Sequence, residues 1–147
     1  MPLTGTFPRV VDEKSRVPVP ARLRDQLDDP QANALYLTPG TDHCVAIYTE
    51  KGLQQLAAKL EQSPPTHSSV RAYMRLFYAQ AERVEIDSQG RIRLPDRLIS
   101  LAGIEREVVV IGVQDHMEVW DRKRWEIFVE ENTPRFDTLA EGAFQPK

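Results

Sequence analysis

The chain has 147 residues and a formal net charge of −3; 41% of its residues are hydrophobic and 28% are charged. This composition is ordinary for a globular protein of one domain or two small modules, and it argues against a protein that coats nucleic acid indiscriminately. No apolar run approaches the roughly 20 residues that span a bilayer, and the N-terminus lacks a signal-peptide layout, so we expect a cytoplasmic protein without a membrane partner.

The single cysteine, Cys44, excludes an internal disulfide, and its neighbours offer no metal-ligand spacing. Cys44 follows His43, but adjacent residues of a strand point to opposite faces, which disfavours a catalytic pair. No nucleophile, base and orienting group cluster along the chain, and no glycine loop is suited to cradling phosphate. The sequence therefore predicts no enzyme, no catalytic residue, no metal site, no cofactor and no small-molecule substrate.

An internal repeat begins near the N-terminus. A predicted strand at residues 6–11 leads into DEKSRVPVPARL at residues 12–23, and a second predicted strand at residues 82–86 leads into DSQGRIRLPDRL at residues 87–98. Both strings fit the pattern Asp-x-x-x-Arg-φ-x-φ-Pro-x-Arg-Leu, where φ is apolar. Such self-similarity indicates that one structural unit was used twice and that its copies pack on or beside each other.

Each string is predicted to form a β-hairpin whose tip holds the shared aspartate and arginine. The Asp-x-x-Gly of the second string is typical of a turn, and the residues after it alternate between polar and apolar. The tips hold Asp12 and Arg16 in the first copy, and Asp87 and Arg91 in the second. We expect the aspartates to accept hydrogen bonds from turn amides or to pair with the nearby arginine.

The two tips differ at two positions. Ser15 stands where the second copy has Gly90, and a non-glycine residue at positive φ costs about 1 kcal/mol or more, so the first tip is either strained or a different turn. Pro18 stands where the second copy has Arg93, and proline donates no ladder hydrogen bond, so its strand must lie at an edge or bulge. We expect inequivalent tips, with the Gly90 tip the more regular one.

The same elements are expected to follow each string: a short helix, two strands and a longer helix. In the first copy these are a helix at residues 21–27 after Pro20, strands at 34–37 and 44–48 around a Pro39-Gly40 turn, and a helix capped by Thr49. In the second they are a helix at residues 96–101 ended by Gly103, strands at 108–111 and 117–120 with a turn at Gly112, and a helix capped by Asp121.

The elements divide the chain into two modules, residues 3–62 and 82–132. A linker helix is expected within residues 63–81, because apolar residues recur there at helical spacing. Residues 133–147 contain two prolines and a glycine and are expected to be a flexible tail.

Positive charge is concentrated in the two strings. Residues 14–24 contain four basic and no acidic residues, and residues 91–97 contain three basic and one acidic; residues 115–147 contain eight acidic against five basic. This distribution is typical of strings that face a polyanion, and a solvated charged surface is the alternative interpretation. A two-stranded hairpin fits the DNA major groove, where an arginine at its tip can contact guanine or phosphate.

These features resemble the MraZ family of bacterial regulators, whose members carry two SpoVT/AbrB-type modules. The paired DxxxR motifs at residues 12–16 and 87–91 carry the resemblance, which covers residues 3–131 and is supported at residues 72–77, 108–112 and 118–120. It implies an α+β fold with a mainly β core: a swapped-hairpin double-split β-barrel, formed by an internal pseudo-dimer of two AbrB-like modules with flanking helices.

The resemblance also implies a function. Family members form ring-like homo-oligomers, for which an octamer is one candidate size, and bind repeated promoter boxes of double-stranded DNA in the division and cell-wall gene cluster, which places them at the nucleoid. The motif match makes Arg16 and Arg91 the DNA-contacting arginines, with Asp12 and Asp87 holding the tips in shape. The full candidate DNA-binding set is Arg16, Arg91, Lys14, Arg93, Gln89, Arg22 and Arg97, and the candidate tip residues are Asp12, Asp87, Ser15 and Gly90.

Two other functions stay open at this point. An AbrB-like antitoxin would need a disordered tail to wrap a toxin, and an oligomeric scaffold would use the basic tips to bind an acidic partner. A single tip with two or three cations would bind DNA weakly at physiological salt, so a DNA-binding protein of this kind must bring several tips to one DNA molecule.

Overall fold

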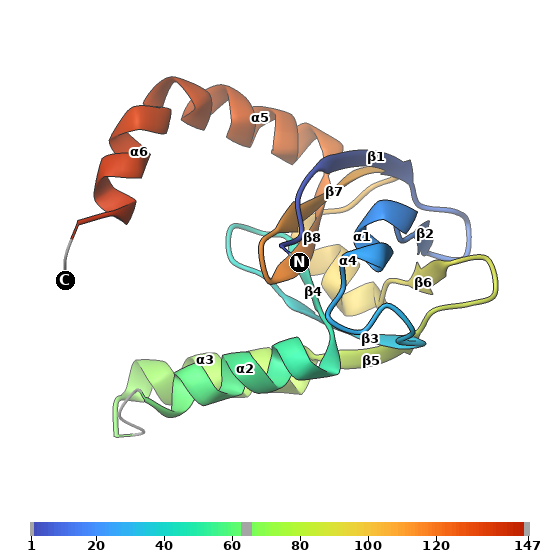
Figure 1. Ribbon diagram of the computed structural model, residues 1–147, viewed down its shortest axis with the longest axis horizontal. Coiled ribbons are helices and arrows are strands. Elements are labelled where there is room, and N and C mark those ends of the chain that lie inside the picture. Colours follow the sequence, from blue (N-terminus) through green and yellow to red (C-terminus); the bar gives the residue numbers. More distant parts are fainter. Residues whose placement is uncertain (1, 63–65, 146–147) are drawn as a thin grey trace.

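The computed structural model describes residues 2–62 and 66–145 of the chain. It is a mixed α+β structure with a six-stranded antiparallel sheet and a separate two-stranded sheet, and the longer helices project away from the strands (Figure 1). The strands are β1 Thr6–Val10, β2 Arg16–Pro18, β3 Ala34–Pro39, β4 Val45–Tyr48, β5 Glu82–Glu85, β6 Arg91–Arg93, β7 Glu107–Val113 and β8 His116–Asp121. The helices are α1 Ala21–Asp25, α2 Glu50–Glu61, α3 Ser68–Gln80, α4 Asp96–Ala102, α5 Arg122–Asn132, the 3-10 helix η1 Thr133–Arg135 and α6 Phe136–Ala143.

The two modules exchange strands. The first strand of each module pairs with the third strand of the other, β1 with β7 and β5 with β3. In addition, β2 pairs with β6, and β4 pairs with β8. The sheet order is β1-β7-β8-β4-β3-β5, so β1 and β5 are edges and the described strands do not close into a barrel. The interlocking of the modules gives them one shared hydrophobic core.

The predicted hairpins need correction. The turn after β1 is closed by the Asp12 N–H, which donates to the Arg16 carbonyl over 2.9 Å, and Asp87 and Arg91 close the second turn in the same way at 2.9 Å. The strands on either side of each turn do not continue as a ladder with each other, because β1 pairs with β7 and β2 pairs with β6. The sequence shows where a chain turns, but not which strand it pairs with next.

The core lies between the sheets and the short helices and uses equivalent residues of both modules. Val17 and Ile92 are opposite each other in the β2–β6 pair, and both are 1% exposed. Leu23 of α1 and Leu98 of α4 are also almost fully buried. Burying apolar side chains of this size stabilises each by about 1.5–3 kcal/mol. The repeat in sequence is therefore a repeat in packing.

The helix ends confirm two expectations and correct a third. The Thr49 hydroxyl caps α2 by accepting from the Gly52 N–H at 3.0 Å, and Gly103 ends α4 in the left-handed conformation with φ of 62°. Asp121 precedes α5 but its side chain does not cap that helix. Its carboxylate instead accepts from the Glu105 N–H at 3.1 Å and lies buried under the β7 end.

Gly112 lies inside β7, not in the predicted turn. The turn between β7 and β8 comes later, at Gln114, whose φ is 65°. The reason for glycine is the close approach of the N-terminal segment, since a Cβ on Gly112 would lie 2.5 Å from the Thr4 nitrogen. The Gly112 N–H donates to the Gly5 carbonyl at 3.0 Å, which fixes the segment against the edge of β7.

Two helical extensions lie on the same side of the core. α2 and α3 run along the bottom of the view in Figure 1, and Phe77 of α3 is buried at 2% exposure where α3 meets β3. The linker-helix prediction of residues 63–81 includes residues 63–65, which are outside the described part. α5, η1 and α6 extend from β8 away from the core. The expected flexible tail is thus helical over residues 133–143, with Pro134 tolerated in the first turn of η1. The flexibility of that tail stays a prediction.

Candidate nucleic-acid interface

The Asp-x-x-x-Arg segments form two turns of the same backbone geometry, which we call the first turn (residues 12–16) and the second turn (residues 87–91). In the first, Asp12 Oδ1 accepts from the N–H groups of Lys14 and Arg16, both at 2.9 Å. In the second, Asp87 Oδ1 accepts from the corresponding two N–H groups, also at 2.9 Å. Each aspartate therefore satisfies the turn amides, as an Asx-type turn requires.

Ser15 occupies the same conformation as Gly90. Its φ is 62°, and the φ of Gly90 is 78°, so both residues lie in the left-handed region. Of the two expectations for Ser15, the strained turn holds and the different turn is wrong. The left-handed conformation costs a residue with a Cβ about 1–2 kcal/mol, and the aspartate hydrogen bonds that hold the turn offset this cost.

The aspartates also orient the arginines. Arg16 Nε donates to Asp12 Oδ2 at 2.8 Å, and Arg91 Nε donates to Asp87 Oδ2 at 3.0 Å. Arg91 Nη1 lies 3.8 Å from Asp12 Oδ2, which links the two turns. Within the described part of the chain, no protein group hydrogen-bonds the terminal nitrogens of Arg16 or Arg91. Apart from the ion pair between Arg91 Nη1 and Asp12, those nitrogens are available to an external acceptor.

Hydrogen bonding keeps both aspartates ionised. The backbone N–H of Arg16 is the main cause that lowers the pKa of Asp12 below its usual value, and the N–H of Arg91 does the same for the pKa of Asp87. Charged carboxylates accept hydrogen bonds more strongly than neutral ones. The arginine side chains are therefore held by charge-assisted contacts at neutral pH.

The paired strands β2 and β6, which we call the ribbon, place three arginines on one face. Arg16 is opposite Arg93, and Pro18 is opposite Arg91. These residues alternate with Val17 and Ile92, which point into the core, so Arg16, Arg91 and Arg93 share the outward face. The prediction that Arg91 and Arg93 face the same way is therefore confirmed.

Pro18 fits because of its position in the ribbon. The Val19 N–H donates to the Gly90 carbonyl at 2.9 Å, which marks that pair as hydrogen-bonded. Hydrogen-bonded and non-hydrogen-bonded pairs alternate along an antiparallel ladder. The neighbouring Pro18–Arg91 pair is therefore non-hydrogen-bonded and requires no N–H from proline. The two strands of the ribbon are both edges, as the proline predicted.

The remaining candidate residues surround the ribbon. Lys14 and Gln89 are exposed in the turns, and Arg22 and Arg97 are exposed in the first turns of α1 and α4. Arg93 is exposed, and its Nε donates to the Lys14 carbonyl at 3.1 Å, so it braces the first turn from the other module. The ribbon and the two turns lie at the right of Figure 1.

Arg24, one of the four basic residues within residues 14–24, lies beside the turn of the other module, a contact that the sequence did not indicate. Its Nη1 lies 3.3 Å from the position that a Cβ on Gly90 would occupy, so a cation of the first module sits beside the second turn. The repeat places Ile99 at the equivalent position of the other module, 75 residues later. The backbones of the two turns are alike, but Arg24 stands beside the second turn, where the repeat offers the first turn only an isoleucine.

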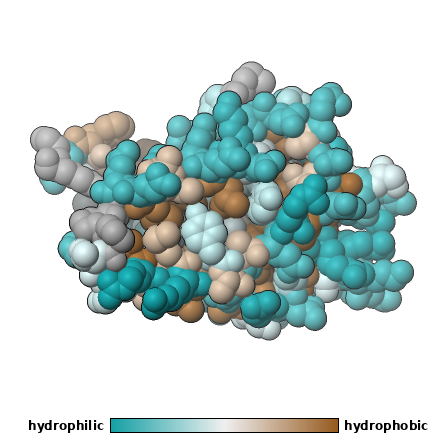
Figure 2. All heavy atoms as spheres, turned by 90° about the horizontal axis from the view of Figure 1, so that it is seen from below, coloured by the Kyte–Doolittle hydropathy of each residue, from teal (hydrophilic) through white to brown (hydrophobic). Residues whose placement is uncertain are grey.

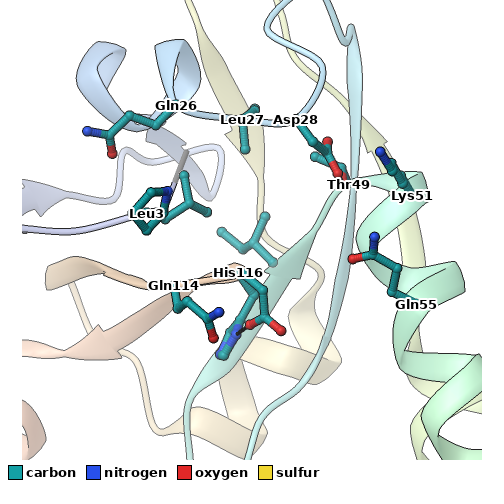
Figure 3. Close-up of a pocket in the computed structure, with 12 residues that line it drawn as sticks. Leu3, Gln26, Leu27, Asp28, Thr49, Lys51, Gln55, Gln114 and His116 are labelled. Atoms are coloured by element: carbon teal, nitrogen blue, oxygen red, sulfur yellow. Dashed lines mark hydrogen bonds and ion pairs between the residues drawn. The ribbon is translucent and has the colours of Figure 1, made fainter.

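A pocket away from the ribbon is lined by His116 (Figure 3). It lies between the N-terminal segment, the end of α1 and the start of α2, and includes His116. The two ring nitrogens of His116 lie 2.8 Å from Asp115 and from Glu118, and its ring stacks on Tyr48. Burial lowers the pKa of His116, but the two carboxylates outweigh burial and raise it overall. With both nitrogens bonded, this histidine is not poised as a general base.

Comparison with known proteins assigns the family. The family model described as MraZ protein, antitoxin-like, matches residues 3–76 and again residues 77–146. The chain belongs to the MraZ family. The double match agrees with the two strand-exchanged modules, and its boundary lies within α3.

MraZ relatives from several bacteria match nearly the whole chain. The "Transcriptional regulator MraZ" of Ligilactobacillus salivarius is 39% identical over 138 residues, which is 94% of each chain. The protein of the same name from Moorella thermoacetica is 36% identical over 137 residues, 93% of each chain. That of Salinispora tropica is 36% identical over 138 residues. No helix among the described residues is long and apolar enough to span a membrane.

Proposed function

We propose that this protein is a sequence-specific DNA-binding transcriptional regulator that acts on repeated promoter boxes of the division and cell-wall gene cluster. The observation that carries the proposal is the outward face of the ribbon, where Arg16, Arg91 and Arg93 lie side by side. The names of the relatives support a regulator of transcription. Location at the nucleoid follows from the proposed DNA partner.

The ribbon is suited to the major groove. A two-stranded ribbon fits that groove, and an arginine can donate two hydrogen bonds to O6 and N7 of guanine. In the first turn, Asp12 binds Nε of Arg16 and leaves the terminal nitrogens to face the base. In the second turn, Asp87 does the same for Arg91. Exposed Lys14, Arg22, Arg93 and Arg97, with Gln89, then contact phosphates and fix the register.

One ribbon makes too few contacts for tight binding at physiological salt. Each phosphate contact adds roughly 0.9 to the slope of log affinity against log salt, so six to ten contacts would be strongly salt-dependent. A ring-like homo-oligomer, of which an octamer is one form, would place several ribbons on repeated boxes, and effective concentration would then supply the affinity. The strand exchange between modules supports the swapped-hairpin double-split barrel as the fold type.

Footprinting and gel shifts on the DNA upstream of the chain's own gene test the proposal. We expect protected repeats, and an Arg91→Ala variant that binds about 5- to 150-fold more weakly, since one bidentate contact contributes about 1–3 kcal/mol. Lys51→Ala, an exposed cation on α2 away from the ribbon, is the matched control and should bind as the wild type does. Equal affinity of Arg91→Ala, Arg16→Ala and wild type would refute DNA reading by the ribbon.

A toxin-binding role has less support. An antitoxin of the AbrB type would need a disordered tail, whereas the chain is helical over Thr133–Arg135 and Phe136–Ala143. A scaffold protein would bind an acidic partner through charge alone. Promoter DNA and random DNA would then compete equally well for its basic turns. A salt-dependent gel shift with both DNA competitors separates that scaffold function from promoter binding.

A further inference from the structure

The C-terminal helix α6 has an apolar face that contacts nothing in its own core. Phe136 is 71% exposed, Leu139 42% and Phe144 87%. Phe136 and Leu139 lie three residues apart on one face of the helix, and Phe144 follows directly after its last residue. Among the described elements, α6 makes substantial contacts with η1 alone, and it projects away from the sheets (Figure 1). Exposed phenylalanines at this density indicate a surface that a partner covers.

A second apolar surface lies on α3. Leu76 is 64% exposed, and the small residues Ala72 and Ala79 lie on the same face, with Tyr73 beside them at 42% exposure. Seen from below, apolar and aromatic side chains gather over α2 and α3 among polar ones (Figure 2). Alanines on either side of a leucine leave room for large side chains of another helix to interdigitate.

The two surfaces carry complementary charge at the same spacing. On α6, Asp137 and Glu141 flank the apolar face four residues apart, and the helix has no basic residue. On α3, Arg71 and Arg75 flank the apolar face four residues apart, and the helix has no acidic residue. Four residues correspond to about 6 Å of rise in any α-helix, so two cations and two carboxylates match in register.

The flanks also match in hand. Successive residues of an α-helix are rotated by about 100°. Viewed down the helix axis from the N-terminus, the acidic pair of α6 lies on one side of the apolar face of α6, and the basic pair of α3 lies on the other side of the apolar face of α3. Opposite flanks meet when two helices pack face to face in parallel, as the e and g positions of parallel coiled coils do. An acidic flank disfavours an anionic membrane surface as the covering partner.

We propose that α6 of one chain packs in parallel on α3 of a second copy of the same chain, with the Asp137–Glu141 pair facing the Arg71–Arg75 pair. This inference rests on the proposed function, because it names the contact that would hold the DNA-binding assembly together. The helical extensions and the two turns lie at opposite ends of the view in Figure 1, so the contact leaves the ribbon open to DNA.

Sedimentation velocity of the full chain measures the assembly directly. We expect a wild-type mass above that of one chain, and a Phe136→Ser, Leu139→Ser variant whose mass falls toward the monomer. Far-UV circular dichroism should be unchanged, because neither side chain is buried in the core. A monomeric wild type, or a double variant of full mass, would overturn the proposal.

Charge exchange tests the pairing itself. Arg75→Glu and Glu141→Arg should each weaken assembly about tenfold or more, and the two together should restore most of the wild-type mass. Lys51→Glu carries the same charge change on α2 and should leave the mass unaltered. No recovery in the combined variant would overturn the pairing. An effect on thermal stability without an effect on mass would place α6 on its own chain, which also contradicts the proposal.

DNA binding distinguishes this inference from the proposed function. If the ribbon reads DNA but α6 does not hold the assembly, Arg91→Ala loses the gel shift while the α6 variant keeps both its mass and its shift. If assembly depends on α6 but the ribbon does not read DNA, the α6 variant loses mass while Arg91→Ala still binds as the wild type does. The two failures therefore give different results.

Discussion

Exchanging the residue types at Ser15 and Gly90 should change stability in opposite directions. Ser15 holds φ of 62°, and the left-handed region costs a residue with a Cβ about 1–2 kcal/mol. Glycine removes this strain but adds about 0.4–1 kcal/mol of conformational entropy to the unfolded chain. We therefore expect Ser15→Gly to raise the free energy of unfolding by about 0.5–1 kcal/mol.

Replacing Gly90 should lower the free energy of unfolding. Gly90→Ala introduces the same strain at φ of 78°, and its Cβ would lie 3.3 Å from Arg24 Nη1, so the guanidinium must shift. The net loss should be about 1 kcal/mol, or roughly 2–4 °C in melting temperature for a chain of this length. The shift of Arg24 should also weaken DNA binding, which Ser15→Gly should leave unchanged.

Urea unfolding at constant m-value measures both changes. Ser88→Gly is the matched control, because Ser88 lies in the second turn without a positive φ. This change should lower the free energy of unfolding by a few tenths of a kcal/mol. If Ser15→Gly were destabilising by as much as Ser88→Gly, the left-handed serine would carry no strain, and the reasoning would be wrong.

Three further predictions follow from single contacts. Replacing Arg24 by isoleucine should weaken promoter binding and reduce the slope of log affinity against log salt by about one, as gel shifts at several salt concentrations would show; an unchanged slope would mean that Arg24 does not contact DNA. Folding raises the pKa of His116 above its ordinary value of 6.5, so its contribution to stability is complete below pH 6.5 and is lost as the pH rises through the raised pKa. His116→Gln should flatten this part of the curve of unfolding free energy against pH. An unaltered curve would contradict the assignment. Thr49→Ala should cost about 1 kcal/mol by removing the cap of α2, measured by urea unfolding, and Thr66→Ala, at an exposed position before α3, should be neutral.

Local features were predictable from the sequence where short-range chemistry decides them. The Asp-x-x-x-Arg turns follow from an aspartate that reaches the amides two and four residues later, and the Thr49 cap follows from its hydroxyl. The end of α4 follows from glycine at the left-handed position. Alternation of polar and apolar residues also predicted that Arg91 and Arg93 share a face. Each depends on residues within about four positions of one another.

The misplaced features depend on contacts between distant segments. Asp121 looked like a helix cap, but the Glu105 N–H competes for its carboxylate. Gly112 looked like a turn, but it makes room for the backbone of the N-terminal segment. A local sequence pattern shows which group requires a hydrogen-bond partner or extra space. Only the tertiary structure determines which distant segment contacts that group.

The sequence by itself determined that one unit occurs twice, that each copy turns at an aspartate and presents an arginine, and that positive charge gathers in those turns. Tertiary structure decided that β2 pairs with β6 across the modules and places Arg16, Arg91 and Arg93 on one face. It also decided that Arg24 of one module stands beside Gly90 of the other. The reason is physical: turn geometry is set by hydrogen bonds within a few residues, whereas strand partners are set by which apolar faces can be buried together.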